Sequence, residues 1–366
     1  MDNHSNSAYE FWNKIGSPKT ALAPMVDYCD LPFRILCRKY NTQLTYTQMY
    51  NSVSFITSEQ YRNKAIKELN KELDNPCFMQ LNGHDPELLL QSVKYVERLV
   101  PCVDINLGCP QQIAKHGHYG AFLLDHPEEV YKIIGYLCNN IKECAISCKI
   151  RLFNDLNSTY ELVRKVRDLG IKVLCVHGRT KEQNKEKVGE TNWEAIHNIK
   201  HMLDIPVISN GGLGTFEDID KCFELTGCDC VMSGEKLIEM PTYFTKSLYD
   251  IDDIVIEYLN TWKQHINEKD IQDNISIIRG HLFKFYYKAC QLNNDYNQRI
   301  ATLKNIDECF NIAQEIKQCR KDIPMNEKYG WYMRHRNKEK QSGTKILNDI
   351  DNDSILEDAG LNDFFG

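Results

Sequence analysis

The sequence predicts an α/β fold, a (β/α)8 TIM barrel followed by a smaller, all-helical C-terminal domain. Between about residues 20 and 240, short apolar segments alternate eight times with longer amphipathic ones, which favours a closed barrel over an open doubly wound sheet. After about residue 251 the apolar positions follow helical spacing and no strand pattern is present. A chain of 366 residues is long enough for both parts. We therefore divide it into an N-terminal extension (1–17), a barrel (18–250), a helical domain (251–321) and a polar, flexible tail (322–366).

Each barrel element has its own local signal. The expected strands are short apolar runs at Ala21–Val26, Gln43–Met49, Cys77–Leu81, Val103–Leu107, Ala145–Ile150, Val173–Val176, Ile205–Ser209 and Cys230–Met232. The helices between them are expected at Leu31–Lys39, Pro86–Leu99, Pro127–Asn139, a segment ending near Leu169, Trp193–Met202 and a segment starting at Thr215. Asp85 is a suitable N-cap for a helix with Pro86 at its first position, and Thr215 with Asp218 resembles a capping box. A miscounted unit is most easily hidden in the long connection Tyr50–Asn75.

Composition excludes several classes of protein. The chain is 42% hydrophobic and 26% charged, and it has no apolar run near the roughly 20 residues that a membrane helix needs. Its first residues are polar and lack the apolar core of a signal peptide, so we expect an intracellular protein, cytoplasmic, with a nuclear location as the alternative. Fifteen cysteines without regular spacing predict free thiols, and we expect no metal site. We expect a monomer.

The segment Val103–Pro110 organises the rest of the chain. Its apolar strand ends in Asn-Leu-Gly-Cys-Pro and so delivers Cys109 into a loop that continues with Lys115 and His118. Free cysteine is usually a small buried hydrophobe, and simple packing is the alternative for Cys109 taken alone. A cysteine at the C-terminal end of a barrel strand, however, lies where barrels place their active sites.

Other polar or glycine residues follow the remaining strands, and in a barrel all of these strand ends converge on one face. They are Pro24, Met25 and Val26 after the first strand, Gln80 after the third, Asn106 and Cys109 after the fourth, Lys149 and Arg151 at the fifth, His177, Gly178, Arg179 and Thr180 at the sixth, Asn210, Gly211 and Gly212 at the seventh, and Ser233 and Gly234 at the eighth. The glycine-rich backbone after strands seven and eight can bind a phosphate. Side-chain amides can hydrogen-bond to the edge of a planar heterocycle, and a lysine can stabilise negative charge. Together they predict a flavin site with a cysteine facing the ring.

The helical domain contains aromatic residues next to cations over Ile277–Lys288. This pattern fits either a bundle core with a solvated basic face or a nucleic-acid surface of cations and stacking rings. The net charge of −7 does not exclude nucleic-acid binding, because a local basic patch sets the affinity for phosphate. A cationic cluster at Arg334–Lys338 is a weak nuclear-import signal.

These motifs resemble the tRNA-dihydrouridine synthase family over roughly residues 18–245. The resemblance rests on Pro24-Met25, Gln80, Asn106-Leu107-Gly108-Cys109-Pro110, Lys149, His177-Gly178-Arg179-Thr180 and Asn210-Gly211-Gly212. The fuller strings are most similar to the eukaryotic branch that acts on D-loop uridines sixteen and seventeen; they are Val26-Asp27, Asn106 to Lys115 with Gly117 to Leu123, and His177 to Gln183. Arg279–Lys284 also resembles the helical domain of that branch.

The resemblance implies an FMN-dependent oxidoreductase that uses NADPH or NADH to reduce the C5–C6 bond of uridine in the tRNA D-loop. It implies that Cys109 is the proton donor. We expect FMN to be held by Pro24, Met25, Val26, Gln80, Asn106, Lys149, His177, Asn210, Gly211, Gly212, Ser233 and Gly234. The expected tRNA contacts are Lys115, His118, Arg179, Arg279 and Lys284. One departure is Glu235, where many family members carry arginine, because a carboxylate cannot pair with the FMN phosphate.

The chemistry supports a thiol independently of the resemblance. Hydride addition at C6 of uracil leaves negative charge that a proton at C5 must quench, and the donor must be neutral at physiological pH yet acidic. A thiol with a reference pKa of about 8.5 meets both conditions. Two alternatives stay open: an FMN-dependent reductase of a free pyrimidine or other small molecule, and a catalytically silent tRNA-binding homologue. The sequence does not decide between NADPH and NADH or fix the uridine position.

Overall fold

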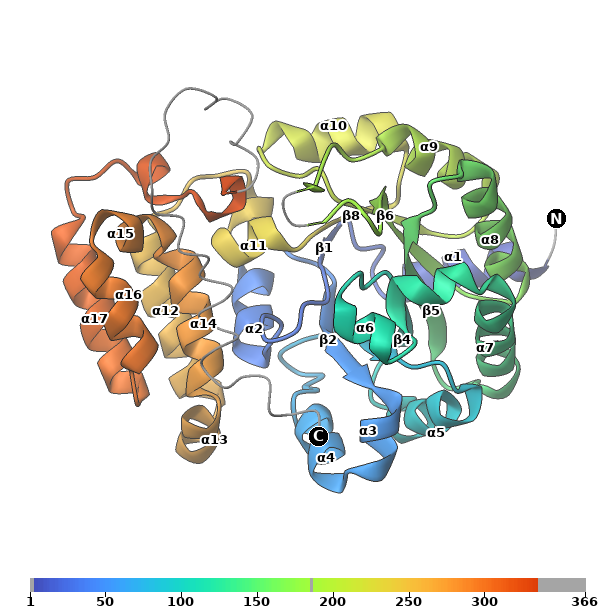
Figure 1. Ribbon diagram of the computed structural model, residues 1–366, viewed down its shortest axis with the longest axis horizontal. Helices are drawn as coiled ribbons and strands as arrows, with labels where there is room; N and C mark the ends of the chain where they lie inside the picture. The colour runs from blue at the N-terminus through green and yellow to red at the C-terminus, as the bar shows by residue number, and fades with distance from the viewer. Residues whose placement is uncertain (1–2, 185–186, 335–366) are drawn as a thin grey trace.

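The computed structural model describes residues 3–184 and 187–334. Eight parallel strands form a barrel that helices surround, and the C-terminal helices pack as a bundle beside it (Figure 1). The strand order is β1-β8-β7-β6-β5-β4-β3-β2. The barrel closes where Ala21 pairs in parallel with Leu44, just before β2, and Leu22 N–H donates to the Leu44 carbonyl at 2.9 Å. The predicted (β/α)8 barrel with a C-terminal helical region is confirmed.

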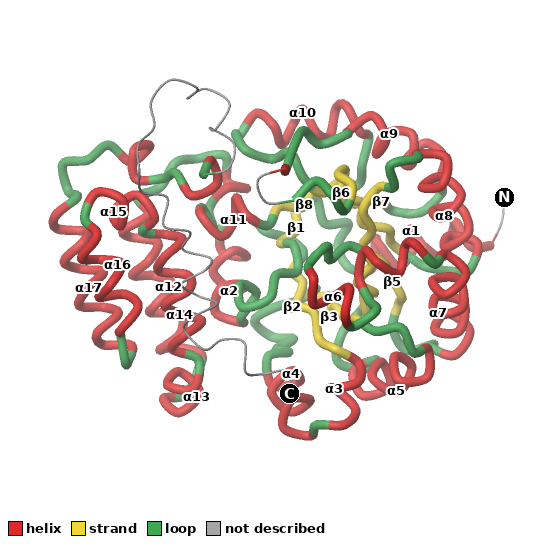
Figure 2. The backbone as a smooth tube through the Cα atoms, in the orientation of Figure 1, coloured by secondary structure: helices red, strands yellow, loops and turns green. Residues whose placement is uncertain are grey.

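All eight predicted strands are present, with shifted ends. They are Thr20–Leu22 (β1), Thr45–Asn51 (β2), Cys77–Asn82 (β3), Cys102–Leu107 (β4), Ala145–Leu152 (β5), Val173–Thr180 (β6), Val207–Asn210 (β7) and Cys230–Ser233 (β8). The first strand ends earlier than predicted, because after Ala23 the chain reaches Pro24, which has no N–H to donate. Pro24, Met25 and Val26 therefore lie in the loop above the barrel. In Figure 2 the strands form the centre of the fold and the helices its outer ring.

The barrel helices also follow the predictions, with additions. They are Asn3–Lys14 (α1), Leu31–Lys39 (α2), Ser52–Thr57 (α3), Glu59–Lys67 (α4), Pro86–Val96 (α5), Gln112–His116 (α6), Pro127–Asn140 (α7), Leu156–Asp168 (α8), Trp193–Met202 (α9), Glu217–Thr226 (α10) and Glu235–Glu239 (α11), with a 3-10 helix at Gly120–Asp125 (η1). Asp85 caps α5 as predicted, accepting from the Glu87 and Leu88 N–H groups. The predicted start of α10 at Thr215 is wrong by two residues, because the Asp218 carboxylate instead accepts from the Thr215 N–H and holds it in the preceding turn. The connection Tyr50–Asn75 contains α3 and α4 and adds no strand to the sheet.

The helical domain starts at residue 251 and shares a core with the barrel. Its helices are Ile251–His265 (α12), Glu268–Asp273 (α13), Ile275–Phe285 (α14), Tyr287–Leu292 (α15), Asn294–Thr302 (α16) and Ile306–Cys319 (α17). Phe33 of α2 lies in one continuous apolar cluster with Tyr258 of α12 and Phe285 of α14. The buried imidazole of His281 on α14 lies 2.8 Å from the Asp30 carboxylate at the start of α2. Side chains from both parts are therefore buried at the same interface.

The segment from residue 322, expected to be a flexible tail, is described as far as Arg334, and this part has a defined structure. It forms two 3-10 helices, Met325–Lys328 (η4) and Trp331–Met333 (η5), and both Trp331 and Tyr332 are buried. Most of the predicted cationic cluster, residues 335–338, lies outside the described residues.

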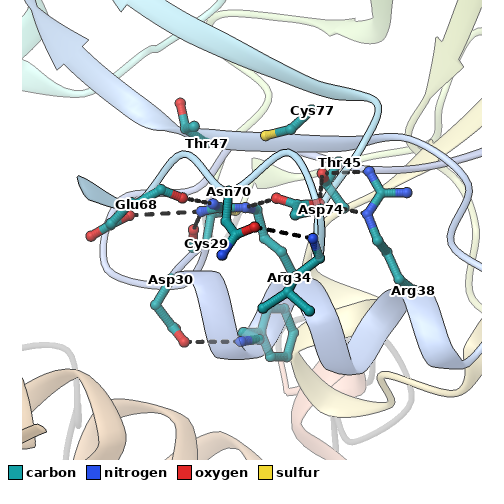
Figure 3. A network of polar contacts seen from close by, with 12 residues as sticks. Cys29, Asp30, Arg34, Arg38, Thr45, Thr47, Glu68, Asn70, Asp74 and Cys77 are labelled. Carbon is teal, nitrogen blue, oxygen red and sulfur yellow. Dashed lines mark hydrogen bonds and ion pairs between the residues drawn. The ribbon is translucent and has the colours of Figure 1, made fainter. Parts of the chain in front are cut away.

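A buried polar network anchors α2 (Figure 3). The guanidinium of Arg34 is fully buried and donates to the Asp74 carboxylate at 2.6 Å and to the Glu68 carbonyl at 2.6 Å. Arg38 and Thr45 bind the other oxygen of Asp74, at 2.5 and 2.6 Å. Burial raises the pKa of Asp74, but the two guanidiniums outweigh this effect and the net pKa is lowered. The network thus joins α2 to the segment that leads into β3.

Three further observations concern disulfides, membrane-spanning helices and metal sites. All fifteen cysteines lie in the described part of the chain and none forms a disulfide. None of the described helices is long and apolar enough to cross a membrane. Among the residues that the structure describes, no group of three or more His, Cys, Asp or Glu side chains could hold a metal ion.

Candidate functional site

A cavity of about 460 Å³ opens at the C-terminal ends of the barrel strands. Its walls are the loops that follow the strands, together with residues of α11 and of the segment after η4. The predicted residues that line it are Pro24, Met25, Val26, Gln80, Asn106, Cys109, Lys149, His177, Arg179, Asn210, Gly211, Gly212, Ser233 and Gly234. The structure thus brings together Cys109, Arg179 and every residue expected to hold the cofactor.

Cys109 is half-buried and held by a defined loop. The Asn106 side-chain oxygen accepts from the N–H groups of Gly108 and Cys109, at 3.1 and 3.0 Å, and so fixes the turn out of β4. On the other side, the Cys109 carbonyl accepts from Ala121 N–H at 3.0 Å. Burial raises the pKa of the Cys109 thiol above its reference value, so the side chain stays protonated at neutral pH.

The two predicted amides bind each other rather than standing free in the cavity. Asn106 donates to the Gln80 side-chain oxygen at 2.8 Å, and Gln80 donates to the Asp104 carboxylate at 2.8 Å. Asp104 lies below them, fully buried, and burial raises its pKa to about 6. The Asn106 amide nitrogen also donates to the sulfur of Met49 at 3.4 Å. The first role of the pair is therefore to fix the loop that carries Cys109.

Lys149 is one of the cations that line the cavity. It projects from β5 into the cavity and, among the described residues, has no hydrogen-bond or ion-pair partner. Burial lowers the pKa of its ammonium group, because the charged form loses hydration and the Asp104 carboxylate offsets this only in part. A desolvated lysine without a partner is a feature that an anionic ligand would stabilise.

The ends of β7 and β8 present backbone to the cavity. Gly211 and Gly212 have φ angles of +101° and +81°, and a Cβ at either position would lie 2.9 Å from a ring atom of His177 or Trp193. Only glycine fits both the conformation and the space there. The side chain of His177 lies beside Gly211, and its Nε2 is 3.3 Å from Arg179. This exposed backbone is the part of a barrel that commonly binds phosphate.

The other predicted tRNA contacts lie away from the cavity. Lys115 is exposed on α6, and His118 is 2.9 Å from Glu129. Arg279 is half-buried and donates to the carbonyl of Ala301 at 2.7 Å. The expectation that Lys284 contacts the tRNA does not fit its position. It is buried, with its ammonium 5.6 and 5.0 Å from the ring centroids of Tyr28 and Trp331.

Several residues of the cavity wall were not among the predicted ligand contacts. Arg151 bridges two loops: it donates to the Gly108 carbonyl at 2.8 Å, next to Cys109, and to the Thr180 carbonyl at 2.8 Å. Its position at the end of the fifth strand was predicted, but these contacts were not. Lys236 and Tyr332 also line the cavity, but Tyr332 belongs to a segment whose composition indicates flexibility. Glu235 faces the cavity as well, and Arg334 lies 3.2 Å from it.

The family model described as Dihydrouridine synthase (Dus) matches residues 21–341. The chain is 36% identical, over 80% of its length and 75% of the relative's, to a Schizosaccharomyces pombe protein named tRNA-dihydrouridine(16/17) synthase (NAD(P)(+)). It is 32% identical to a Mus musculus protein named tRNA-dihydrouridine(16/17) synthase (NAD(P)(+))-like, over 86% of this chain and 65% of that protein.

The chain thus spans about two thirds to three quarters of the length of these relatives. Among solved structures, histamine dehydrogenase from Rhizobium sp. 4-9 is similar with a TM-score of 0.50 and 8% identity, over 66% of this chain and 49% of that one. This likeness supports the barrel fold alone. The family model covers most of the chain, and the relatives exceed 30% identity over most of its length. The chain belongs to the dihydrouridine synthase family.

Proposed function

We propose that this protein is a tRNA-dihydrouridine synthase, an FMN-dependent oxidoreductase that uses NADPH or NADH to reduce the C5–C6 double bond of uridine in tRNA. The observation that carries the proposal is the arrangement in one cavity of a protonated thiol, Cys109, and a cation, Lys149, for which the described residues offer no ion-pair partner. The family and the names of the relatives agree with it.

The residues present fit FMN. A cavity of about 460 Å³ lies in the usual range for cofactor sites, roughly 300–1,000 Å³. The glycine backbone after β7 and the start of α11 offer N–H groups for a phosphate, and Met25, Met49 and Met232 offer apolar contacts for a planar ring. Lys149 supplies the positive charge that an electron-rich ring requires. Bound FMN, once reduced by NAD(P)H, supplies the hydride that adds to C6 of the uracil ring.

The protein's own part in the reaction is proton donation and positioning. Cys109 donates its proton to C5 of uracil, which quenches the negative charge left on the ring. Asn106 and Arg151 hold the peptide that precedes Cys109, the Ala121 N–H holds the Cys109 carbonyl on the other side, and Gln80 holds Asn106. The target uridine must leave its stack to enter the cavity, which costs only a few kcal/mol for a loop nucleotide.

We propose uridines 16 and 17 of the D-loop as the positions that are reduced. The support is that both relatives described above carry these numbers in their names, and that they match the chain over 80% or more of its length. Lys115, His118, Arg179 and Arg279 remain the proposed tRNA contacts. The monomeric state and the intracellular, cytoplasmic location stay predictions.

One experiment tests the proposal against both alternatives. The purified protein is examined by absorbance under anaerobic conditions, first alone or with added FMN, then with NADPH or NADH, then with tRNA that lacks dihydrouridine. We expect a flavin spectrum that bleaches with the reductant and returns with tRNA, and dihydrouridine at positions 16 and 17 by mass spectrometry. Return with a free pyrimidine but not with tRNA would establish the small-molecule reductase. Failure to bind FMN would favour the silent tRNA-binding homologue.

A further inference from the structure

The segment Lys328–Arg334, here called the C-terminal strap, is fastened to the molecule by buried polar contacts. The ammonium of Lys328 is buried and lies 2.7 and 2.8 Å from the carboxylates of Asp250 and Asp252, at the start of α12. Two residues later, the buried carboxylate of Glu239 accepts from the Gly330 N–H at 2.5 Å. These contacts join residues 76 to 91 positions apart in the sequence, so the strap is held at defined points.

The strap also forms part of the cavity wall. Tyr332 lines the cavity together with Glu235 and Lys236 of α11. The ring of Tyr332 packs so closely on the loop after β7 that a Cβ at Gly214 would lie 2.9 Å from it. Lys236 lies 5.5 Å from the centre of the same ring and pairs with Glu239 at 2.8 Å. The strap therefore closes the side of the cavity where β7 and β8 end.

This side of the cavity holds a charge that an anionic ligand would repel. Glu235 is separated from β8 by Gly234 alone and lines the cavity, next to the glycine backbone that suits a phosphate. The guanidinium of Arg334 lies 3.2 Å from the Glu235 carboxylate. Arg334 is held in place by stacking on Trp331, at 3.7 Å from the ring centroid, and by donating to the Trp331 carbonyl at 3.2 Å. The cation is thus ordered before any ligand arrives.

We propose that the C-terminal strap is a wall of the cofactor pocket and that Arg334 is a positioning residue, which neutralises Glu235 so that the pocket accepts a phosphate-bearing ligand. This inference rests on the proposed function, in which that ligand is FMN. A carboxylate near a phosphate weakens binding by Coulomb repulsion, and a guanidinium within ion-pair distance removes most of that repulsion. The inference explains why an acidic residue is tolerated at the end of β8.

The test compares two ligands that differ only in the phosphate. Full-length protein freed of bound flavin is titrated with FMN and with riboflavin, and binding is followed by flavin fluorescence. We expect Arg334→Ala to weaken FMN binding roughly tenfold, because Glu235 is then uncompensated, and to change riboflavin binding less than about twofold. Arg334→Lys should restore most of the FMN affinity. The double variant Glu235→Gln/Arg334→Ala should restore it too, because it removes both charges. Arg299→Ala, which breaks an Arg–Glu pair on α16 and α17 at 2.6 Å, is the matched control and should change neither affinity.

The outcomes separate the two proposals. If the unaltered protein binds neither flavin, the proposed function fails. If it binds FMN and Arg334→Ala binds FMN equally well, the role of Arg334 is wrong while the proposed function stands. If Arg334→Ala lowers the affinity for both flavins equally, and the double variant Glu235→Gln/Arg334→Ala does not restore it, the strap acts through folding alone. The proposed neutralisation of Glu235 would then be wrong.

Discussion

At the scale of single residues, the thiol of Cys109 shows how burial prepares a group for its task. Desolvation is the largest influence on this thiol and raises its pKa, while Arg151 and Lys149 act in the opposite direction. A proton donor must keep its proton until the ring requires it, so a raised pKa favours the acid form. The same burial lowers the pKa of Lys149, and a bound anion would oppose that effect.

Replacing Cys109 by alanine removes the proposed proton donor and leaves the cavity lining otherwise intact. We expect Cys109→Ala to bind FMN with unchanged affinity and to form dihydrouridine at least about 100-fold more slowly, the usual contribution of a general acid. Single-turnover assays with pre-reduced enzyme and unmodified tRNA measure this rate. Cys319→Ala is the matched control, since Cys319 is exposed on α17 away from the cavity. A normal rate in Cys109→Ala would remove Cys109 from its assigned role.

The raised pKa of Cys109 also predicts a pH profile. The donor form is the protonated thiol, which is present below the pKa of Cys109 and is lost as pH rises through it. Because that pKa lies above the ordinary value of about 8.5, the single-turnover rate should stay level from pH 7 to beyond 8.5 and fall only at higher pH. Stopped-flow measurements across this range check the profile, with circular dichroism at each pH to show that the fold persists. A rate that already falls between pH 7 and 8 would contradict the predicted direction.

At the scale of secondary-structure elements, a buried network of charged side chains anchors α2 to the barrel. Arg34 is fully buried, and its guanidinium binds Asp74 and the carbonyls of Glu68 and Cys29 (Figure 3). Removing one partner of such a group leaves a buried charge without compensation, which costs more than the pair contributes in net stability. Asp74 binds a second guanidinium, that of Arg38, and so is the centre of the network.

We expect Asp74→Asn to lower the free energy of unfolding by about 3–5 kcal/mol, measured by urea denaturation at pH 7. The effect should diminish in acid. The folded-state pKa of Asp74 is lowered, so its contribution is complete above the unfolded pKa of about 3.9 and is lost as pH falls through the folded value. Arg299→Ala is the control, because an exposed pair contributes about 1 kcal/mol or less. An equally small cost for Asp74→Asn would mean that water replaces the lost contacts.

The strands and most barrel helices could be predicted because each carries its own signal. A short apolar run such as Val103–Leu107 and a cap such as Asp85 act over a few residues, and the barrel then brings the strand ends together. The helices α3 and α4 were less predictable, since α4 buries little more than Ala65 and has a weak apolar stripe. The partners of Gln80 and Asn106 were also missed. A side-chain amide can hydrogen-bond equally well to a heterocycle and to a neighbouring amide. Only the register of β3 beside β4 determines that Asn106 and Gln80 bind each other.

At the scale of the whole molecule, contacts between residues far apart in the sequence determine features of the fold that local sequence patterns do not predict. The strap belongs to the segment after residue 322, whose polar composition as a whole predicts a flexible tail, yet Lys328 is buried and pairs with carboxylates 76 and 78 residues away. At residue 250 the chain changes from alternating strands and helices to helices alone. The two parts nevertheless pack against each other in one core. Phe33 of the barrel lies 6.3 Å from the ring of Tyr258 and 4.4 Å from that of His281, both in the helical domain.

A shared core predicts that the barrel and the helical domain unfold together. Phe33→Ala would leave a cavity between them, and we expect it to lower the free energy of unfolding by about 3–5 kcal/mol in both parts at once. Hydrogen exchange followed by mass spectrometry resolves the two parts, since amides of β4 and β5 report on the barrel and those of α12 and α17 on the helical domain. Leu292→Ala is the control: its side chain is 74% exposed, so its effect should stay within about 0.5 kcal/mol. If protection fell in α12 and α17 alone, the helical domain would be an independent unit. Its removal would then be a valid way to separate tRNA binding from catalysis, whereas a joint loss means that only point substitutions can do so.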